Sequence, residues 1–483
     1  MYYQLAEDIR LVSYKEMPYG IYSGKDRRTN FIPDKELYLM LYRCDGHSDI
    51  DTAELSEYGQ KIFDEMLRIG IVKQLDEPLE APVTIPAAFY SNRYRASVHW
   101  SITGKCNYNC RHCFQSAPDG VLGEPSYEEL VDIIHQMKAC GIPAVELTGG
   151  EPLIRDDFFE IVDECLRNDI AVSTIYSNGA LITQEFLDEL KKRVPECAFQ
   201  LSFDGVGYHD WMRGVPGAEQ IAFDAMALLK KNGYRFSTAM CLCKENAGSI
   251  KETIMKLTEA GSAGLKIQKT MPQGMWADET EHFLTNEETL EIYEDLIRWY
   301  AETPDLLGVQ LEGVCALNPP KDGGKTTANI LMEMNLTEEK LQTVPCCGVL
   351  LSHFFIGPNG AVTPCMSMCG AAIESQFPNL FETPLADILS DSSLISLSAA
   401  KCADVVDANE KCHECPDRLN CCGGRCRAMA VGEAGTDYYC ADEFTCWFFK
   451  SGWYGKIRAA IDECFEKPDD DNKDMPENME MTC

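Results

Sequence analysis

Six short apolar runs alternate with amphipathic segments between residues 97 and 268, and this alternation constrains the fold more than any other feature. The runs predict strands, and they are SVHWSI (97–102), AVELT (144–148), AVSTIY (171–176), AFQLSF (198–203), RFSTAMC (235–241) and GLKIQ (264–268). The amphipathic segments predict helices near 126–140, 156–168, 183–193, 218–232 and 248–260. Repeats of this kind predict an α/β fold with a parallel sheet, either a partial (βα)6 TIM-like barrel or an open doubly wound sheet.

Unusual motifs follow the strands. CNYNCRHCF (106–114) comes after the first strand, TGGEP (148–152) after the second and SNG (177–179) after the third, while Ser202 and Asp204 end the fourth. Parallel α/β folds place their active sites at the carboxyl ends of the strands. The positions of these motifs therefore predict an enzyme.

Three cysteines lie in the first motif, with the spacing Cys-x3-Cys-x2-Cys: Cys106, Cys110 and Cys113. A structural zinc site normally has four protein ligands, so three ligands indicate a centre with one open position. Thiolates in such a loop can hold three corners of a four-iron cluster. A zinc site or a chance cluster of cysteines is the alternative.

The motif resembles that of the radical S-adenosylmethionine (radical SAM) superfamily, Cys-x3-Cys-x-aromatic-Cys, with His112 in the aromatic position, where it is expected to pack near the adenine. The resemblance implies a [4Fe-4S] cluster whose free iron binds S-adenosylmethionine. TGGEP resembles the family's motif for the methionine amino group, and further positions match contacts to the ribose or the carboxylate of the cofactor. These expected cofactor-binding residues are Gly149, Gly150, Glu151, Pro152, Ser177, Asn178, Ser202 and Arg213. For each polar residue alone, a structural role is the alternative.

The family resemblance also implies a mechanism. An electron donor such as flavodoxin or ferredoxin reduces the cluster, which cleaves S-adenosylmethionine to methionine and a 5′-deoxyadenosyl radical. This radical abstracts hydrogen from an unactivated C–H bond of the substrate, while the protein positions the reactants and excludes water.

After residue 310 the regular pattern fades and cysteines accumulate, as expected for a region that needs metal to fold. The cysteines resemble those of the SPASM extension, which implies two auxiliary [4Fe-4S] clusters; a pair of zinc knuckles is the alternative. An inserted residue leaves open whether Cys421 or Cys422 is a ligand, and Cys346, Cys369 and Cys440 are possible substitutes. The expected ligands are Cys347, Cys365, Cys412, Cys415, Cys421 or Cys422, Cys426 and Cys446.

Residues 1–80 predict a winged-helix-like domain. Its expected strands are DIRLVSYK, YGIYS and IVKQL (71–75), and its expected helices are 36–43 and 54–70. With its helix–DG–helix pattern, it resembles the domain by which ribosomal-peptide maturases bind a leader peptide along a strand edge. A stabilising cap is the alternative. We predict a linker at 81–95, the barrel at 96–310, the SPASM domain at 311–455 and an acidic tail at 456–483.

A net charge of −34 disfavours nucleic acid as a partner. No apolar run has membrane-spanning length and no signal peptide is evident, so we expect a cytoplasmic protein whose 24 cysteines mainly serve packing and metal binding.

These features together favour a maturase that acts on a cysteine-containing precursor peptide with a leader, most simply by forming thioether crosslinks. Carbon–carbon crosslinking, epimerisation and radical modification of a small molecule such as a tetrapyrrole precursor are the alternatives. Anaerobic sulfatase maturation fits less well, because Met366 follows Cys365 where that subfamily has an aspartate base. The sequence reveals no general acid or base.

Overall fold

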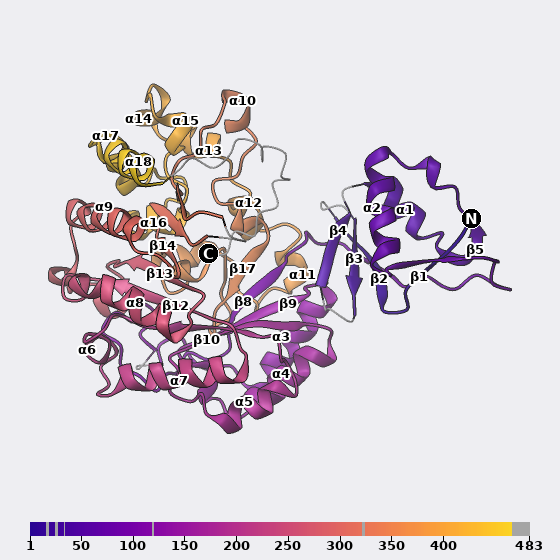
Figure 1. Cartoon of the computed structure of the whole chain (residues 1–483), viewed down its shortest axis with the longest axis horizontal. Helices are drawn as coiled ribbons and strands as arrows, with labels where there is room; N and C mark the ends of the chain where they lie inside the picture. Colours follow the sequence, from indigo (N-terminus) through magenta and orange to yellow (C-terminus); the bar gives the residue numbers. More distant parts are fainter. Residues whose placement is uncertain (16–18, 25–27, 33, 118–119, 321–323, 466–483) are drawn as a thin grey trace.

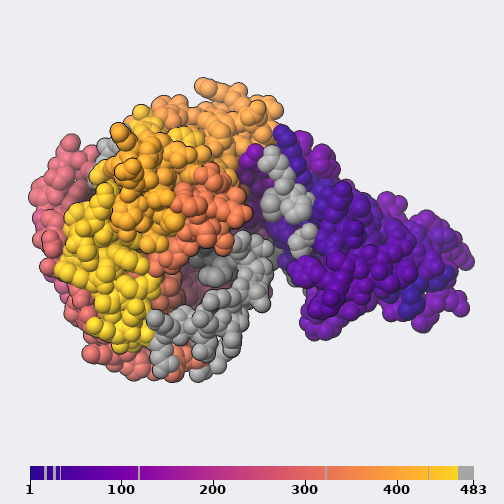
Figure 2. Space-filling view, turned by 90° about the horizontal axis from the view of Figure 1, so that it is seen from above, coloured from indigo at the N-terminus to yellow at the C-terminus, as the bar shows by residue number. Residues whose placement is uncertain are grey.

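The computed structural model of the chain describes residues 1–15, 19–24, 28–32, 34–117, 120–320 and 324–465. A small N-terminal domain projects from a larger α/β body (Figure 1). In the view from above, the C-terminal residues, orange to yellow, cover much of the visible face of that body (Figure 2).

The six predicted strands are confirmed and stand side by side in chain order, all parallel. They are β8 (Ser97–Ser101), β9 (Ala144–Thr148), β10 (Ala171–Ser177), β11 (Ala198–Ser202), β12 (Phe236–Leu242) and β13 (Gly264–Lys269). The five predicted helices are also confirmed as α3 (Tyr127–Ala139), α4 (Phe158–Arg167), α5 (Gln184–Lys191), α7 (Ala218–Asn232) and α8 (Ile250–Ala260). A doubly wound sheet reverses its strand order at a switch point, and this order does not, so the body is a partial barrel.

The two faces of the barrel sheet differ in polarity. One row of strand residues, which includes Trp100, Val145 and Leu147, is fully buried in a core shared with α3 and α4. The alternate row is polar and half-buried, and includes His99 and Glu146. Since successive strand residues point to opposite faces, the apolar row packs on the helices and the polar row lines the inside of the barrel.

The C-terminal region extends the sheet at both edges. Beyond β13 come β14 (Gly308–Leu311), then antiparallel β15 (Cys315–Asn318) and β16 (Thr327–Ile330). At the other edge β17 (His353–Ile356) pairs in parallel with β8, and β18 (Val362–Thr363) follows it. The sheet therefore continues past residue 310, where we predicted the barrel domain to end.

Helices complete the body. Two belong to the barrel, α6 (His209–Arg213) and α9 (Asn286–Glu302), and the cysteine-rich region has α10 (Glu338–Leu341), α11 (Leu385–Ile388), α12 (Ser393–Ser398), α13 (Cys402–Ala408), α14 (Glu410–His413), α15 (Arg418–Cys421), α16 (Arg427–Ala434), α17 (Glu443–Lys450) and α18 (Trp453–Cys464). The predicted tail at 456–483 is wrong for its first part, because α18 packs against α9 and buries Ile457 and Ile461. Residues 466–483 lie outside the described residues. No described helix is both long and apolar enough to cross a membrane.

The N-terminal unit is a small β domain with two helices, richer in strands than we predicted. One sheet has the order β5-β1-β6, formed by β1 (Tyr2–Leu5), β5 (Asp45–Asp49) and β6 (Val72–Leu75). The other has the order β4-β3-β2-β7, formed by β2 (Ile9–Tyr14), β3 (Tyr19–Ser23), β4 (Arg28–Ile32) and β7 (Ala87–Tyr90). The helices are α1 (Lys35–Leu41) and α2 (Glu57–Arg68).

Two differences from prediction stand out in this domain. The strand β5 occupies the DG segment where the helix–DG–helix pattern led straight into a helix, and Gly46 takes a φ of +76° there, which favours glycine. The strand β7 lies within the predicted linker and pairs with β2. The helices are capped by Asp34 and Ser56, whose side chains accept backbone N–H groups and join each other at 2.8 Å, so α2 begins at Glu57 rather than at the predicted residue 54.

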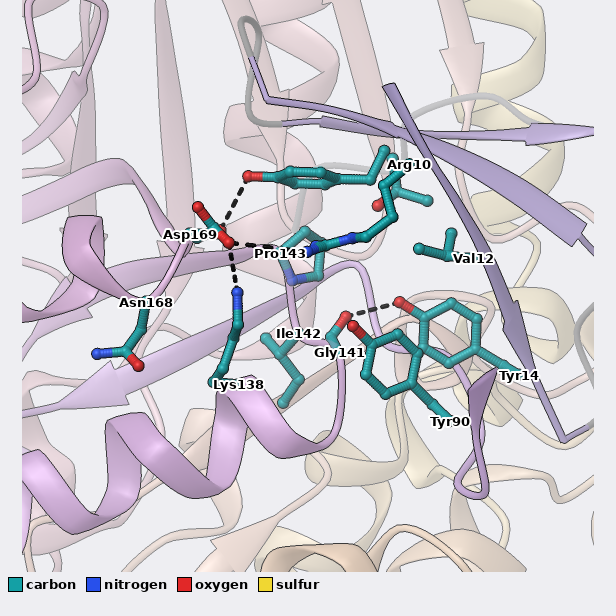
Figure 3. A pocket seen from close by; sticks show the side chains of 12 residues that line it. Arg10, Val12, Tyr14, Tyr90, Lys138, Gly141, Ile142, Pro143, Asn168 and Asp169 are labelled. Carbon is teal, nitrogen blue, oxygen red and sulfur yellow. Dashed lines mark hydrogen bonds and ion pairs between the residues drawn. The ribbon is translucent and has the colours of Figure 1, made fainter. Parts of the chain in front are cut away.

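The N-terminal domain contacts the barrel through tyrosines (Figure 3). The Tyr14 hydroxyl donates to the carbonyl of Gly141 at 2.6 Å, and the Tyr22 hydroxyl donates to the carbonyl of Asp169 at 3.2 Å. Gly141 and Asp169 precede β9 and β10, so the domain docks at the amino ends of the strands. The predicted functional loops lie at the opposite, carboxyl ends.

Candidate functional site

Glu151 joins three of the loops at the carboxyl ends of the strands. Its carboxylate is fully buried and accepts hydrogen bonds from the Ser177 hydroxyl at 2.9 Å and the Asn178 backbone N–H at 2.8 Å. Its own N–H donates to the carbonyl of Lys105 at 2.9 Å. The Asn178 side chain in turn donates to Asn107 at 2.8 Å, within the cysteine loop. The three predicted motifs therefore form one connected site.

Burial gives this carboxylate unusual electrostatics. It raises the pKa of Glu151 to about 7, against the opposing effect of the hydrogen bonds from Asn178 and Ser177. A cationic group bound at the carboxylate would counter the cost of burying its charge. The site thus has the chemistry to hold an ammonium group, such as the one that the family motif is expected to bind.

The two glycines of TGGEP let its backbone lie directly against the backbone of residues 103–105. A Cβ on Gly149 would lie 2.6 Å from the carbonyl oxygen of Thr103, and one on Gly150 would lie 2.1 Å from that of Lys105. No other residue fits these positions without moving the chain that leads into the cysteine loop. Pro152 then begins a short 3-10 helix, Pro152–Ile154.

The three cysteines of the loop come together, and each thiol accepts a hydrogen bond. Cys106, Cys110 and Cys113 belong to one small cluster, with Cys110 buried and the other two half-buried. The donors are the backbone N–H of Tyr108 to Cys106 at 3.4 Å, that of Ala117 to Cys113 at 3.3 Å, and the Arg213 guanidinium to Cys110 at 3.6 Å.

This donor set fits an iron–sulfur cluster. Burial raises the pKa of the Cys106 thiol to about 12, and the charges of Glu151, Cys110 and Cys113 add to the effect, so the thiolates need a metal to form. Among the described residues no three Cys, His, Asp or Glu side chains converge to hold a single metal ion. A cluster differs from such a site because each thiolate binds its own iron.

Arg213, which is expected to contact the cofactor, forms a buried ion pair. Its Nε lies 2.7 Å from the Asp204 carboxylate, and its Nη1 donates to the Cys110 thiol at 3.6 Å. Burial acts to raise the pKa of Asp204, but the charges of Arg213, His112 and His209 outweigh it and hold that pKa below its ordinary value. The pair explains how a fully buried carboxylate remains ionised at this site.

His112 lies beside the Asp204–Arg213 pair, and Ser202 precedes Asp204 by two residues in the chain. The His112 Nε2 lies 3.8 Å from the Asp204 carboxylate, and its ring centroid is 6.0 Å from that of Trp276. Ser202 is the last residue of β11 and stands opposite Ala239 of β12. The sequence marked Asp204 only as a strand end, and no spacing signal identified it as the partner of Arg213.

In the C-terminal region one thiol group has four members. The thiol of Cys421 is close enough to three others for their charges to add to the effect of burial and raise its pKa to about 11. The group is Cys412, Cys415, Cys421 and Cys446. Cys422, which follows the last residue of α15 and takes the left-handed conformation at φ +51°, instead approaches Cys402. The geometry thus favours Cys421 over Cys422 as a ligand.

A second thiol group lies around Tyr438. Burial, and then the charges of Cys365, Cys347 and Cys346, raise the pKa of the Tyr438 hydroxyl, and burial, followed by the charge of Cys347, raises the pKa of Cys426. The group is Cys347, Cys365 and Cys426. The cysteines suggested as substitute ligands have other hydrogen-bond partners. The Cys346 thiol donates to the carbonyl of Lys401 at 3.0 Å, and the Cys440 thiol donates to the carbonyl of Ala430 at 3.2 Å. The Cys369 thiol forms a hydrogen bond with the Glu374 side chain.

Comparisons with known proteins agree with these two regions. Residues 100–257 match the model of the radical SAM superfamily, and residues 346–416 match SPASM, an iron–sulfur cluster-binding domain. The AdoMet-dependent heme synthase of Methanosarcina barkeri (strain Fusaro / DSM 804) is 27% identical over 343 residues, 69% of this chain and 92% of that protein. Mycofactocin maturase MftC of Mycobacterium ulcerans (strain Agy99) is 27% identical over 212 residues, 43% of this chain and 53% of MftC.

A solved structure extends the likeness to the N-terminal domain. Streptococcus suis SuiB bound to precursor peptide SuiA superimposes with a TM-score of 0.60 at 16% identity, over 92% of this chain and 99% of SuiB. At this identity the likeness shows a shared fold. The first family match includes the cysteine loop and TGGEP, and the second includes Cys347, Cys365, Cys412 and Cys415 of the C-terminal thiol groups. These two regions of the chain are therefore similar to the radical SAM superfamily and to the SPASM domain.

Proposed function

We propose that this protein is a radical SAM enzyme, and that it oxidatively modifies a peptide substrate that its N-terminal domain helps to capture. The observation that carries the proposal is that domain, because the fold likeness to SuiB, which was crystallised bound to precursor peptide SuiA, covers 92% of this chain. The heme synthase of M. barkeri, in contrast, aligns with 69% of this chain.

In this proposal, different residues hold the cofactor and the iron–sulfur clusters. When bound to the cluster, S-adenosylmethionine supplies a carbon radical that can abstract hydrogen. Cys106, Cys110 and Cys113 would hold that cluster, and Glu151 would bind the ammonium group of the cofactor. The two C-terminal thiol groups would hold auxiliary clusters, which would supply a site for electron transfer.

The N-terminal domain offers strand edges. Within the described residues β4 and β7 end one of its sheets, and β5 and β6 end the other. The edge of β5 is partly occupied, because its Asp45 and Gly46 carbonyls accept from the N–H groups of Val83 and Leu79. An extended peptide can add to such an edge through backbone hydrogen bonds, with side-chain pockets giving specificity. This is the mode that we propose for a leader peptide.

A second candidate function is work on a heme precursor. The observation that favours it is the heme synthase of M. barkeri, which aligns over 92% of its length. The inside of the barrel argues against it, because heme carries propionate carboxylates that need cations. Across strands β8 to β14 and β17 the basic residues are Lys266 and Lys269, and both have partners: Lys266 pairs with Glu312 at 3.4 Å, and Lys269 with Asn286 at 2.6 Å.

Anaerobic co-expression tests the two candidates together. The enzyme is produced with each short reading frame encoded beside its gene, and the peptides are weighed before and after thiol alkylation. We expect a loss of two hydrogens per crosslink; a matching loss of alkylatable thiols would establish the predicted thioether, and unchanged thiol number a different crosslink.

The control is the variant in which Cys106, Cys110 and Cys113 are all replaced by alanine, which should leave every peptide unmodified. An unchanged mass calls for chiral analysis of the peptide residues, since epimerisation leaves mass unaltered. If no peptide is altered and the purified enzyme instead converts a heme precursor, the peptide proposal is wrong and the second candidate stands.

A further inference from the structure

A cluster of polar side chains lies on the inside of the barrel, below the cofactor loops, and the proposed chemistry has not used it. We call it the Glu146 cluster and define it as Ser97, His99, Glu146 and Tyr176. These residues come from the three adjacent strands β8, β9 and β10, and His99 stands directly opposite Glu146 in the register. A cluster built from three strands has a rigid frame.

Glu146 is the centre of the cluster. Its carboxylate accepts hydrogen bonds from the Ser97 hydroxyl at 3.0 Å and the Tyr176 hydroxyl at 2.9 Å, one on each oxygen. Each carboxylate oxygen has lone pairs for more than one donor, so the group retains accepting capacity. The hydroxyls hold it in place without supplying a positive charge.

His99 gives the second, independent observation. Its ring stacks on Tyr176 with centroids 4.5 Å apart and meets Phe355 edge-on at 5.5 Å. Its Nε2 atom is buried and has no hydrogen-bond partner among the residues that the structure describes. A polar group of a bound substrate could supply the hydrogen bond that this atom lacks.

The imidazole is neutral at physiological pH. Burial lowers the pKa of His99 to about 4, although the Glu146 charge acts in the opposite direction and His353 and Lys266 act with burial. The described groups around the cluster are thus one carboxylate, neutral hydroxyls, a neutral imidazole, His353 and the Lys266–Glu312 pair. The local surface can accept hydrogen bonds from a cation, but it would repel an additional anion.

Its position suits a substrate. Glu146 lies two residues before Thr148, where TGGEP begins, and Tyr176 directly precedes Ser177 of the SNG loop. With a rise of about 3.3 Å per residue, the cluster lies roughly 3–7 Å below the loops that surround the cofactor site. A group bound here would stand on the inner side of the barrel, beneath the place where hydrogen is abstracted.

We propose that the Glu146 cluster binds a cationic side chain of the substrate, an ammonium or guanidinium group, which salt-bridges Glu146 with an N–H directed to His99. This inference rests on the proposed function and deepens it by naming the chemistry of the substrate. It assigns Glu146 and His99 to specificity: they hold a basic residue of the peptide so that a neighbouring C–H bond meets the radical.

Small probes test the proposal without a known substrate. The full-length enzyme, with reconstituted clusters and S-adenosylmethionine, is titrated with the Nα-acetyl methylamides of lysine, arginine, norleucine and glutamate, and dissociation constants are measured by ligand-observed NMR. We expect the lysine and arginine probes to bind at least about tenfold more tightly than norleucine, and the glutamate probe to bind most weakly.

Variants identify the group responsible. Glu146→Gln keeps the shape but removes the charge, and it should abolish the preference for the basic probes. Glu146→Asp keeps the charge and should retain part of the preference, which guards against a folding defect in the first variant. Glu160→Gln, on the exposed face of α4, should behave as the wild type.

The proposal is overturned if norleucine binds as tightly as lysine, or if Glu146→Gln keeps the preference. Its failure can be told from failure of the proposed function. A peptide that is modified by Glu146→Gln with unchanged KM would remove only the cationic specificity. Conversion of a heme precursor with no peptide product would remove the proposed function, whatever the probes show.

Discussion

Replacing Asp204 by asparagine tests the electrostatic arrangement at the cysteine loop. Asp204 is fully buried, its carboxylate lies 2.7 Å from the Arg213 Nε, and its other oxygen accepts from the Cys241 N–H at 2.9 Å. Asparagine can keep the second contact. It removes the negative charge beside Arg213 and presents either a neutral oxygen or a clashing donor to the guanidinium.

The magnitude follows from the burial of both partners. Removing one member of a buried ion pair leaves the other charge uncompensated, and this typically costs about 3–5 kcal/mol. For a domain of this size, each kcal/mol lowers the unfolding temperature by about 2–4 °C, so we expect a decrease of roughly 6–20 °C. The double variant Asp204→Asn/Arg213→Met, which removes both charges, should recover part of the loss.

Anaerobic scanning fluorimetry of cluster-free protein measures these temperatures. The matched control is Asp295→Asn, the same change in an exposed pair with Lys251 at 2.6 Å, which should leave the temperature unchanged within error. The reasoning fails if Asp204→Asn lowers the unfolding temperature no more than this control does, or if the double variant unfolds at a lower temperature than Asp204→Asn.

The pH dependence has a definite sign. Because the folded pKa of Asp204 is lowered, its contribution is present above the unfolded pKa of about 3.9 and is lost as pH falls through the folded value. The difference between wild type and Asp204→Asn should therefore be constant between about pH 6 and 8, and should shrink only below about pH 4.

Three other changes test the remaining parts of the molecule. Cys421→Ala should remove about four iron atoms per chain from reconstituted protein and Cys422→Ala none, and iron loss from the latter would contradict the assignment. Gly150→Ala puts a methyl group 2.1 Å from a carbonyl oxygen, so S-adenosylmethionine binding by equilibrium dialysis should weaken at least about tenfold, whereas Gly248→Ala, with nothing within 4 Å, should bind normally. Tyr14→Phe removes a 2.6 Å hydrogen bond worth about 0.5–1.5 kcal/mol, and amide exchange should quicken where the N-terminal domain meets the barrel; unchanged exchange would argue that this contact does not hold the domain.

Periodicity explains why the barrel could be predicted. Its strands alternate buried and half-buried residues and its helices carry apolar stripes, so both patterns are visible in a single sequence. The missed strands lack that signal. The strand Asp45–Asp49 reads DGHSD, and β7 follows prolines in a segment that resembles a linker. Their pairing partners, rather than their own sequences, make them strands.

The sequence likewise predicted some features of the candidate site and not others. Motifs at the ends of strands predicted which loops would meet, because parallel strands bring their carboxyl ends to one edge. Spacing could not show that Arg213 pairs with Asp204, since the choice depends on how α6 returns toward the strand before it. Nor could it separate Cys421 from Cys422, which differ in the backbone: Cys421 ends the helix, while Cys422 turns left-handed at φ +51°.

The thiol group of Cys347, Cys365 and Cys426 is linked through the sheet to the cofactor loop. Cys347 and Cys365 lie on either side of the β17–β18 hairpin, and β17 pairs along its whole length with β8, from His353 opposite Ser97 to Ile356 opposite Trp100. The strand β8 leads directly into the loop that begins at Cys106. Binding iron at Cys347 and Cys365 would fix both ends of the hairpin, and with them the edge of the sheet that carries the cofactor cysteines. The region that resembles SPASM is therefore structurally part of the barrel sheet, because without its hairpin β8 would be an exposed edge strand.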